Sequence, residues 1–236
     1  MRFPFGIGKV YMMITDDQQR RLKDLQKVFM EENAKLNLSA MRDEQAIWIG
    51  NISDSLVALD LPLFQTSDLK ILDIGTGGGF PLLPLAICKP DCHFTGIDST
   101  EKKLDAIGRM VEALELSNVT LIAGRAEQLG KDADYREQYD IVTARALAPL
   151  NTLLEYCAPF AKVGGHVVAW KSMKIETERS ESLLASAELS CHLIDQYEYE
   201  LPDDWGKRQL MIYEKTAKTN QKYPREVGTP KKKPLI

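Results

Sequence analysis

The feature that most constrains the fold of this chain is the run from Ile71 to Pro81, which reads Ile-Leu-Asp-Ile-Gly-Thr-Gly-Gly-Gly-Phe-Pro. Its first four residues form a short, mostly apolar stretch typical of a buried strand, and Pro81 suits the first turn of a helix. Between them, glycine allows positive φ angles and close approach of a ligand, and the following helix offers free N–H groups. The run therefore predicts a nucleotide-binding turn that joins a buried strand to a helix.

The residues around this turn distinguish between kinds of nucleotide. A dinucleotide-binding turn of the G-x-G-x-x-G/A type needs a small residue at position 80, where this chain has Phe80. A phosphate-binding loop of the G-K-[ST] type needs a lysine after the glycines, and this sequence has none there. The remaining pattern, from Asp73 to Gly79, is Asp-x-Gly-x-Gly-x-Gly. It resembles the first motif of the class I S-adenosylmethionine-dependent methyltransferases, whose loop supports a cofactor without phosphates.

A carboxylate at the end of the next predicted strand agrees with this interpretation. Asp98 closes the sequence Gly-Ile-Asp, 23 residues after Gly75. A carboxylate at that position can accept hydrogen bonds from both ribose hydroxyls. Asp98 could instead only cap the helix that begins near Glu101. Beside the glycine-rich turn, ribose binding is the favoured interpretation.

Strands and helices are predicted to alternate from Leu69 onward, which indicates an α/β fold with a Rossmann-like, doubly wound, mostly parallel sheet. Each strand candidate is a short apolar run, as expected for strands buried on both faces. The last two are joined by a turn-rich segment, Pro202 to Gly206, which predicts an antiparallel last strand. The seven predicted strands are Leu69–Gly75, His93–Asp98, Val119–Ala123, Tyr139–Ala144, Gly165–Lys171, Leu193–Leu201 and Arg208–Lys215. The predicted helices between them are Pro81–Cys88, Glu101–Leu116, Ala148–Phe160 and Lys174–Ala187.

The two ends of the chain differ from this core. Residues 1–64 are predicted to form a helical N-terminal section. A first helix starts at Thr15 and Asp16 and runs to about Lys35, and a second runs from about Asp43 until Pro62 ends it. Residues 65–216 form the predicted S-adenosylmethionine-binding core, and residues 217–236 a linker-like basic tail.

The composition favours a cytoplasmic protein. The chain has 236 residues, of which 44% are hydrophobic and 27% charged, as in soluble globular proteins. No apolar run approaches the ~20 residues of a membrane helix, and residues 1–13 are too interrupted for a secretory signal. Cys88 and Cys92, next to His93, could suggest a metal site, but no second pair completes it. No metal is therefore predicted.

Charge is distributed unevenly along the chain. The net charge is −4, but residues 218–236 hold six Lys or Arg side chains against one carboxylate, Glu226. This segment therefore carries +5 and the rest of the chain −9. An acidic body with a basic end suits a protein whose end meets phosphate, although lysine-rich termini are also common for solubility alone. The expected RNA contacts are Arg225, Lys231, Lys232 and Lys233.

Several further segments resemble those of one family, the bacterial 16S rRNA guanine-N7 methyltransferases known as RsmG (GidB). The glycine turn from Gly75 to Pro81 is one of them, and the resemblance extends from about Ile14 over nearly the whole chain. The family usually has His where this chain has Asn51 and Gly where it has Leu82. The other matching segments are Asn37-Leu38-Ser39, Asp54-Ser55-Leu56, Pro84-Leu85-Ala86-Ile87, Asp98-Ser99 with Lys102-Lys103, Gly124-Arg125-Ala126-Glu127, Ala144-Arg145-Ala146, Tyr223-Pro224-Arg225 and Gly228-Thr229-Pro230.

The resemblance implies transfer of a methyl group from S-adenosylmethionine to N7 of a guanosine in 16S rRNA. The RNA partner would be free or within the small ribosomal subunit, and the oligomeric state is left open. The resemblance assigns five residues to cofactor binding, and the glycine turn and the second strand add Gly77 and Asp98. The five are Gly75, Phe80, Ala126, Glu127 and Arg145.

Methylation at guanine N7 needs no general base, because this nitrogen already carries an accessible lone pair. Orienting groups alone are expected, Arg145 first and Asp54 second. Arg145 closes the fourth strand, where ligands bind in open α/β sheets, but it could instead pair structurally with Asp54 or Asp73. Glu127 could be only an acid favoured at a helix start. The competing functions are a small-molecule methyltransferase and a non-catalytic, RNA-binding nucleotide-binding module.

Overall fold

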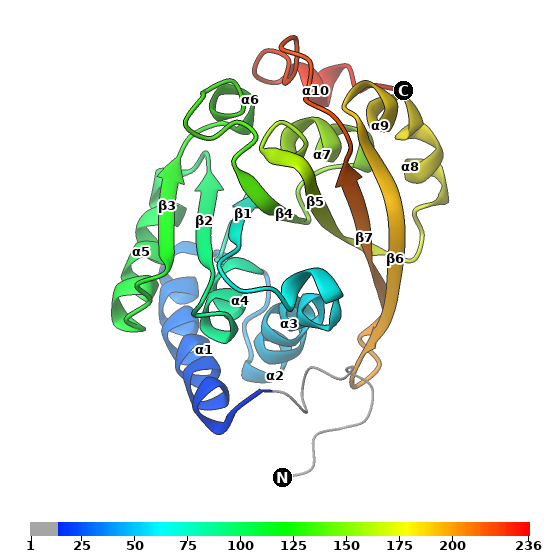
Figure 1. Ribbon diagram of the computed structural model, residues 1–236. Helices are drawn as coiled ribbons and strands as arrows, with labels where there is room; N and C mark the ends of the chain where they lie inside the picture. The colour runs from blue at the N-terminus through cyan, green and yellow to red at the C-terminus, as the bar shows by residue number, and fades with distance from the viewer. Residues whose placement is uncertain (1–13) are drawn as a thin grey trace.

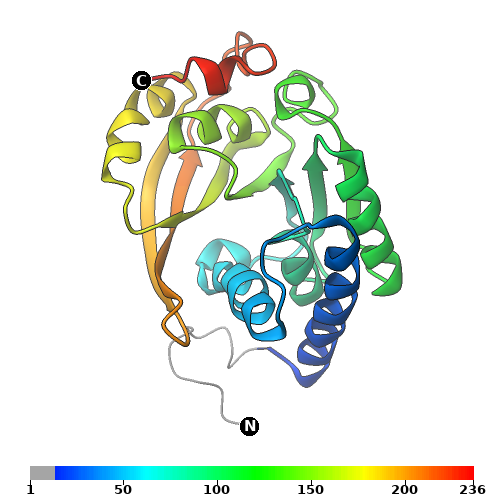
Figure 2. The same ribbon diagram turned by 180° about the vertical axis from the view of Figure 1, so that it is seen from behind.

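The computed structural model describes residues 14–236, so the expectation for residues 1–13 lies outside the described residues. Within the described range one seven-stranded sheet has the order β3-β2-β1-β4-β5-β7-β6. Helices cover both of its faces (Figure 1, Figure 2). Neighbouring strands are parallel except for β7, which lies antiparallel between β5 and β6. The predicted doubly wound sheet with an antiparallel last strand is confirmed.

All seven predicted strands are present, and the helices pack in two layers. The strands are β1 (Lys70–Ile74), β2 (His93–Asp98), β3 (Val119–Ala123), β4 (Tyr139–Arg145), β5 (Ala161–Ser172), β6 (Cys191–Leu201) and β7 (Gly206–Lys215). The first layer contains α1 (Asp16–Leu36), α2 (Glu44–Ile47), α3 (Asp54–Leu56), α4 (Leu82–Cys88) and α5 (Glu101–Ala113). The second contains α6 (Ala126–Leu129), α7 (Leu150–Cys157), α8 (Glu176–Glu181), α9 (Leu183–Glu188) and α10 (Thr229–Lys232).

Neighbouring residues of one strand enter two separate cores, because successive side chains of a strand point to opposite faces of the sheet. Ile71 and Ile141 pack with residues of α1, α4 and α5. Leu72 and Val142 pack with residues of α7 and α9 on the other face. Both faces are therefore apolar, which explains why the strands are continuous apolar runs in the sequence.

The helical N-terminal section begins as predicted. The Thr15 hydroxyl accepts a hydrogen bond from the Gln18 N–H (3.2 Å), and the Gln18 side chain accepts one from the Thr15 N–H (3.0 Å). This reciprocal pair is a capping box, which satisfies two backbone donors at the start of α1.

The second helical stretch, predicted from about Asp43 until Pro62, is present, but it is not one regular α-helix. A π-helical segment (Trp48–Ser53) follows α2, and after α3 the chain forms a 3₁₀ turn (Val57–Asp60) and a second one at Pro62–Phe64. In a regular helix the Gly50 carbonyl would accept the Asp54 N–H, but that N–H bonds to Ile49 and Asn51 instead. The Gly50 carbonyl accepts from Arg145 (2.9 Å), so a contact distant in sequence favours the wider turn.

The predicted helix Lys174–Ala187 is also wrong as a single element. It is divided into α8 and α9 at Ser182, whose hydroxyl donates to the Arg179 carbonyl (2.8 Å). A serine that bonds to its own backbone in this way competes with regular helix hydrogen bonding.

The C-terminal segment, residues 217–236, is folded onto the core, so the expectation of a linker-like tail is wrong. Tyr223 is only 4% exposed, and Pro230 is buried. Arg136 donates to the carbonyls of Thr219 (2.7 Å) and Tyr223 (2.9 Å). Prolines and charged residues usually indicate a disordered segment. Here the composition gave the wrong prediction, because residues elsewhere in the chain bind this segment and hold it on the core.

The cysteines are buried free thiols in the described range. Burial raises the pKa of Cys88 to about 12, so this thiol stays protonated. Buried free thiols such as Cys88 and Cys92 behave as small apolar residues. Among residues 14–236 no helix has both the length and the apolar character to cross a membrane.

Candidate cofactor and RNA site

A cavity of about 490 Å³ lies at the carboxyl ends of β1, β2, β3 and β4. This edge is where ligands bind in open α/β sheets. The structure brings all seven sequence-predicted cofactor residues together in the wall of this one cavity. They are Gly75, Gly77, Phe80, Asp98, Ala126, Glu127 and Arg145.

The glycine turn is anchored to the neighbouring strand. The N–H groups of Gly75 and Thr76 donate to the Ile97 carbonyl of β2 (2.8 and 3.1 Å). Gly75 has φ +70°, and a Cβ added there would lie 2.6 Å from the Leu147 side chain. Gly77 has φ +58°, and the nearest atom to a Cβ added there is the Gly75 carbonyl oxygen at 3.6 Å. The turn therefore requires glycine for its conformation and presents backbone to the cavity.

Asp98 supports the turn and also faces the cavity. Its carboxylate accepts the Gly77 N–H (3.0 Å) and the Thr100 N–H (2.9 Å), just before α5 begins. Thr100 is the N-cap residue of α5 and precedes its first turn, so Asp98 supports the approach to the helix and does not cap it. A carboxylate has about four lone-pair sites, and the two that remain are available to ribose hydroxyls.

Phe80 and Arg145 form an adjoining part of the wall. The Phe80 ring packs edge-on against Phe29 of α1 at 4.8 Å between ring centres. The Arg145 guanidinium lies 5.8 Å from the centre of the Phe80 ring. Its N–H groups also donate to the Gly50 carbonyl (2.9 Å) and the Asn51 side-chain oxygen (2.8 Å). The π-helical segment and the fourth strand thus fix Arg145 from two directions.

Asp54 lies behind Arg145 and outside the cavity wall. Its side chain is 1% exposed and accepts from Arg145 (2.9 Å), Arg208 (3.0 Å) and the Tyr199 hydroxyl (2.6 Å). Burial and the Asp54 charge raise the pKa of Tyr199, so its hydroxyl remains a donor. Arg145 therefore pairs with Asp54 and also lines the cavity. Asp54 can act only through Arg145.

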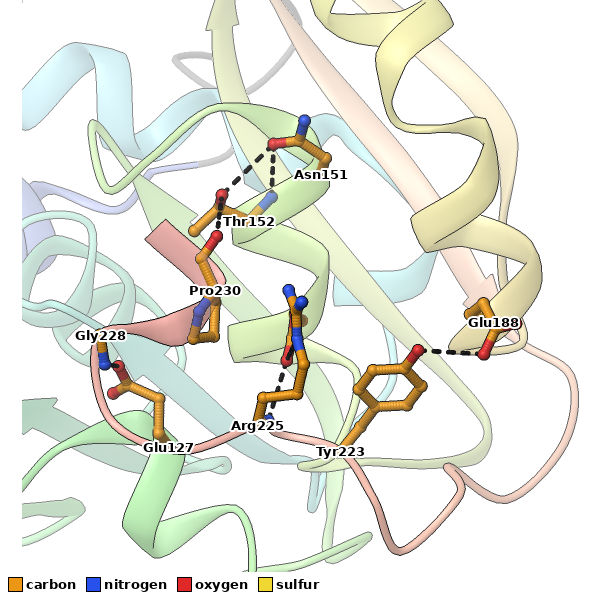
Figure 3. Close-up of polar contacts among 9 residues, drawn as sticks. Glu127, Asn151, Thr152, Glu188, Tyr223, Arg225, Gly228 and Pro230 are labelled. Atoms are coloured by element: carbon orange, nitrogen blue, oxygen red, sulfur yellow. Dashed lines mark hydrogen bonds and ion pairs between the residues drawn. The ribbon is translucent and has the colours of Figure 1, made fainter. Parts of the chain in front are cut away.

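The C-terminal segment contacts the cavity residue Glu127 through Gly228 (Figure 3), and its own Lys231 lines the cavity. Glu127 is 5% exposed, and its carboxylate accepts the Gly228 N–H (2.9 Å). Lys231 lines the cavity, whereas Lys232 and Lys233 are exposed outside it. The segment predicted to carry RNA contacts therefore also borders this cavity.

Arg225 has an internal partner. Its guanidinium binds both oxygens of Glu155 on α7 (2.6–3.1 Å), and its backbone N–H donates to the same carboxylate (2.8 Å). Glu155 is fully buried. Because these contacts commit the Arg225 side chain to the core, we do not retain it among the proposed RNA contacts.

Several cavity residues had no assigned role in the sequence analysis. Lys103 and Arg125 lie in segments that resemble the family, so the resemblance could have indicated them. Tyr156 lies in no such segment, and nothing in the sequence indicated it. Of the two departures from the family, Asn51 lines the cavity, and Leu82 is buried in the core beside Gly96. The change at position 51 therefore alters the wall of the site, and the change at position 82 alters its support.

Asp73 lies beneath the turn and gives stability a pH dependence. Burial raises its pKa to about 6. The hydroxyls of Thr76 and Thr143 and the charge of Arg145 lower the pKa, but their effect is smaller than that of burial. An unfolded Asp titrates near about 4. The folded state holds this proton more tightly, so the group is neutral toward stability below pH ~4 and destabilises the fold progressively as pH rises through about 6.

Replacing Asp73 with asparagine is expected to remove this dependence. The unfolding free energy of Asp73→Asn minus that of the parent protein should rise by about 2–3 kcal/mol when the pH is raised from 4 to 7.5. Urea unfolding of both proteins at the two pH values measures the difference. A constant difference between the two proteins would contradict the raised pKa.

The turn after β1, the carboxylate at the end of β2 and the antiparallel strand beside β5 define a class I methyltransferase fold. A methyltransferase from Aquifex aeolicus described as SAM-dependent has a TM-score of 0.54 and 14% identity, with 86% of this chain and all of that chain covered. TYW2 of M. jannaschii, solved with AdoMet, has a TM-score of 0.53 and 19% identity over 70% of this chain and 76% of that chain.

The family is shown by sequence comparison. The family model described as rRNA small subunit methyltransferase G (GidB) matches residues 18–199. The "Ribosomal RNA small subunit methyltransferase G" of Staphylococcus saprophyticus is 41% identical over 223 residues, 94% of this chain and 92% of that protein. The protein of the same name from Lactobacillus helveticus is 38% identical over 239 residues, 99% and 98% of the two chains. The chain belongs to the rRNA small subunit methyltransferase G family.

Proposed function

We propose that the protein transfers the methyl group of S-adenosylmethionine to N7 of a guanosine in 16S rRNA, in the cytoplasm. The observation that carries the proposal is that all seven residues expected to bind the cofactor line one cavity, in a chain of this family. A small-molecule methyltransferase could use the same turn, but the unpaired cations at this cavity favour a phosphate-rich substrate.

The described residues fit S-adenosylmethionine, which supplies an electrophilic methyl group when bound. The backbone at Gly75 and Gly77 carries no side chain, so it can support the amino acid and ribose portions by close approach. The free lone pairs of Asp98 suit the ribose hydroxyls. Ala126 and Glu127 are the first residues of α6, just after β3, and would contact the adenine ring there.

Arg145 is the proposed orienting residue for the guanine. Guanine N7 needs no deprotonation, so the contribution of the protein is to exclude water and hold the reacting atoms in line. Positioning of this kind can lower a barrier by ~7–11 kcal/mol. Arg145 suits the role because the Gly50 carbonyl, Asn51 and Asp54 hold its guanidinium from behind at 2.8–2.9 Å.

The proposed RNA surface consists of cations around the cavity mouth. Within residues 14–236 no acidic partner lies within ion-pair distance of Lys103, Arg125 or Lys231, all three of which line the cavity. Lys232 and Lys233 likewise form no ion pair with any of residues 14–236. Unpaired cations suit phosphate binding, and a stacked base must also be splayed out to enter a cavity of this kind.

Replacing Lys231, Lys232 and Lys233 together with alanine is expected to weaken RNA binding and to flatten its salt dependence. Each lost phosphate contact should reduce the slope of log affinity against log salt by about 0.7–0.9. Filter binding of a 16S rRNA fragment between 50 and 200 mM KCl measures the slope. An alanine variant of Lys23, Lys27 and Lys35 on α1 is the control, and an equal loss in both variants would contradict the assignment.

Methyl transfer is expected to proceed without a metal ion in the protein. Within residues 14–236 no three His, Cys, Asp or Glu side chains are grouped to hold one. Dialysis against EDTA should leave the rate within about twofold once Mg²⁺ is restored to the RNA alone. Activity that returns only with zinc added to the protein would contradict the direct displacement.

Incubation with tritiated S-adenosylmethionine tests the proposed function. Naked 16S rRNA and 30S particles, each isolated from a strain that lacks the endogenous enzyme, are the two substrates. Labelled 7-methylguanosine in the nuclease digest of either one supports the proposal. Label at another base, or label only in small molecules of a cell extract, would overturn it and favour the alternatives.

A further inference from the structure

The C-terminal segment from Tyr223 to Lys233 packs along the edge of the cavity although it follows the last strand of the fold. In both ribbon views α10 lies between α6 and α9, above α7 (Figure 1, Figure 2). Its contacts form a series along the segment, through Tyr223, Arg225, Gly228 and Pro230 in turn (Figure 3). The position of this segment is therefore built into the fold.

Two of these contacts fix the segment on α7. The Arg225 guanidinium neutralises the fully buried Glu155 carboxylate through contacts of 2.6–3.1 Å. The Thr152 hydroxyl donates to the Pro230 carbonyl at 3.2 Å. Between these two anchors the chain turns at Gly228, which has φ +79° and open space around its Cβ position. Both anchors lie outside the cavity wall, so they hold the turn without occupying the site.

The turn meets the cavity through one hydrogen bond. The Gly228 N–H donates to Glu127 at 2.9 Å. Glu127 is nearly fully buried, and within residues 14–236 this is the one hydrogen bond described for its carboxylate. A buried carboxylate with a single protein donor depends on that donor for its orientation, and its remaining lone pairs are directed by the same contact.

We propose that the C-terminal segment is part of the cofactor site, in which the Gly228 N–H positions the Glu127 carboxylate for the cofactor. Gly228 is a positioning residue, because it acts through Glu127 and does not itself line the cavity. Lys231, three residues later, completes the same wall. The inference rests on the proposed binding of S-adenosylmethionine and adds a chain segment that lies outside the residues 18–199 matched by the family model.

Gly228→Ala is expected to raise the Kd for S-adenosylmethionine about tenfold, the size of one lost hydrogen bond to a carboxylate. Alanine is strained at this φ, and relief of the strain moves the N–H away from Glu127. Gly164→Ala is the matched control, because Gly164 also has positive φ (+82°) and an open Cβ position, but lies outside the cavity wall. Calorimetric titration gives each Kd, and thermal melting gives the loss of stability that backbone strain causes in both variants.

A double-mutant cycle separates positioning from general loosening of the segment. In a Glu127→Ala background, Gly228→Ala should change the Kd less than twofold, because its target is already absent. Equal Kd values for Gly228→Ala and Gly164→Ala would overturn the inference, as would an equal loss with and without Glu127. Failure of the parent protein to bind S-adenosylmethionine would instead overturn the proposed function.

Discussion

Gly77→Val should abolish measurable binding of S-adenosylmethionine, with a rise in Kd of at least about 100-fold, while the fold is retained. Gly77 has φ +58°, which a β-branched residue adopts only under strain. The nearest atom to an added Cβ is the Gly75 carbonyl oxygen at 3.6 Å, so the side chain would not disturb the core. Its two methyl groups would instead project into the cavity and displace the N–H that binds Asp98. Calorimetry measures the affinity, and circular dichroism the fold.

Gly164→Val separates backbone strain from obstruction of the cavity. Gly164 lies on an exposed part of β5, with φ +82° and no atom within 4 Å of an added Cβ. This variant should lose a similar amount of stability to strain and keep its cofactor affinity. Retained binding in Gly77→Val would show that the cofactor does not lie against this turn.

The position of the cavity could be predicted from the sequence because the turn and the strand ends that form it are local. The strand, the glycine turn and the helix start are contiguous between Ile71 and Cys88, and Asp98 ends the next strand along the chain. In a parallel sheet, strand ends of this kind meet at one edge. The local pattern was therefore sufficient for Gly77 and Asp98, whereas the other five residues were assigned by the family resemblance.

The contacts that the sequence did not reveal join residues far apart in the chain. Arg208 and Tyr199 reach Asp54 across about 150 residues, and Gly228 reaches Glu127 across 101. Neither periodicity nor composition encodes such pairs. The π-helical segment has the same origin, since the Gly50 carbonyl is taken by Arg145, 95 residues away. Composition alone likewise predicted a linker for the C-terminal segment, because it does not reveal the partners on α7 and α9 that hold this segment.

Asp54→Ala is expected to lower the unfolding free energy by about 3–5 kcal/mol, because it removes one partner from a buried ionic cluster. Arg145 and Arg208 would face each other with no shared carboxylate, and the buried Tyr199 hydroxyl would lose its acceptor. In variants that still fold at low temperature, the rate of methyl transfer should fall about 100-fold, because Arg145 loses a contact that holds it in the cavity wall. Urea unfolding and single-turnover transfer at 10 °C measure the two effects.

Asp60→Ala provides the comparison that assigns these effects to the charge cluster. Asp60 also accepts a tyrosine hydroxyl, from Tyr197 at 2.8 Å, but within residues 14–236 it has no cationic partner and it is only partly buried. Its loss should cost about 1 kcal/mol, the contribution of an ordinary hydrogen bond, and leave the rate of transfer unchanged. If Asp54→Ala were as mild as Asp60→Ala, then Gly50 and Asn51 alone would suffice to hold Arg145. In that case the orientation of this guanidinium would be set by the π-helical segment and not by the buried carboxylate.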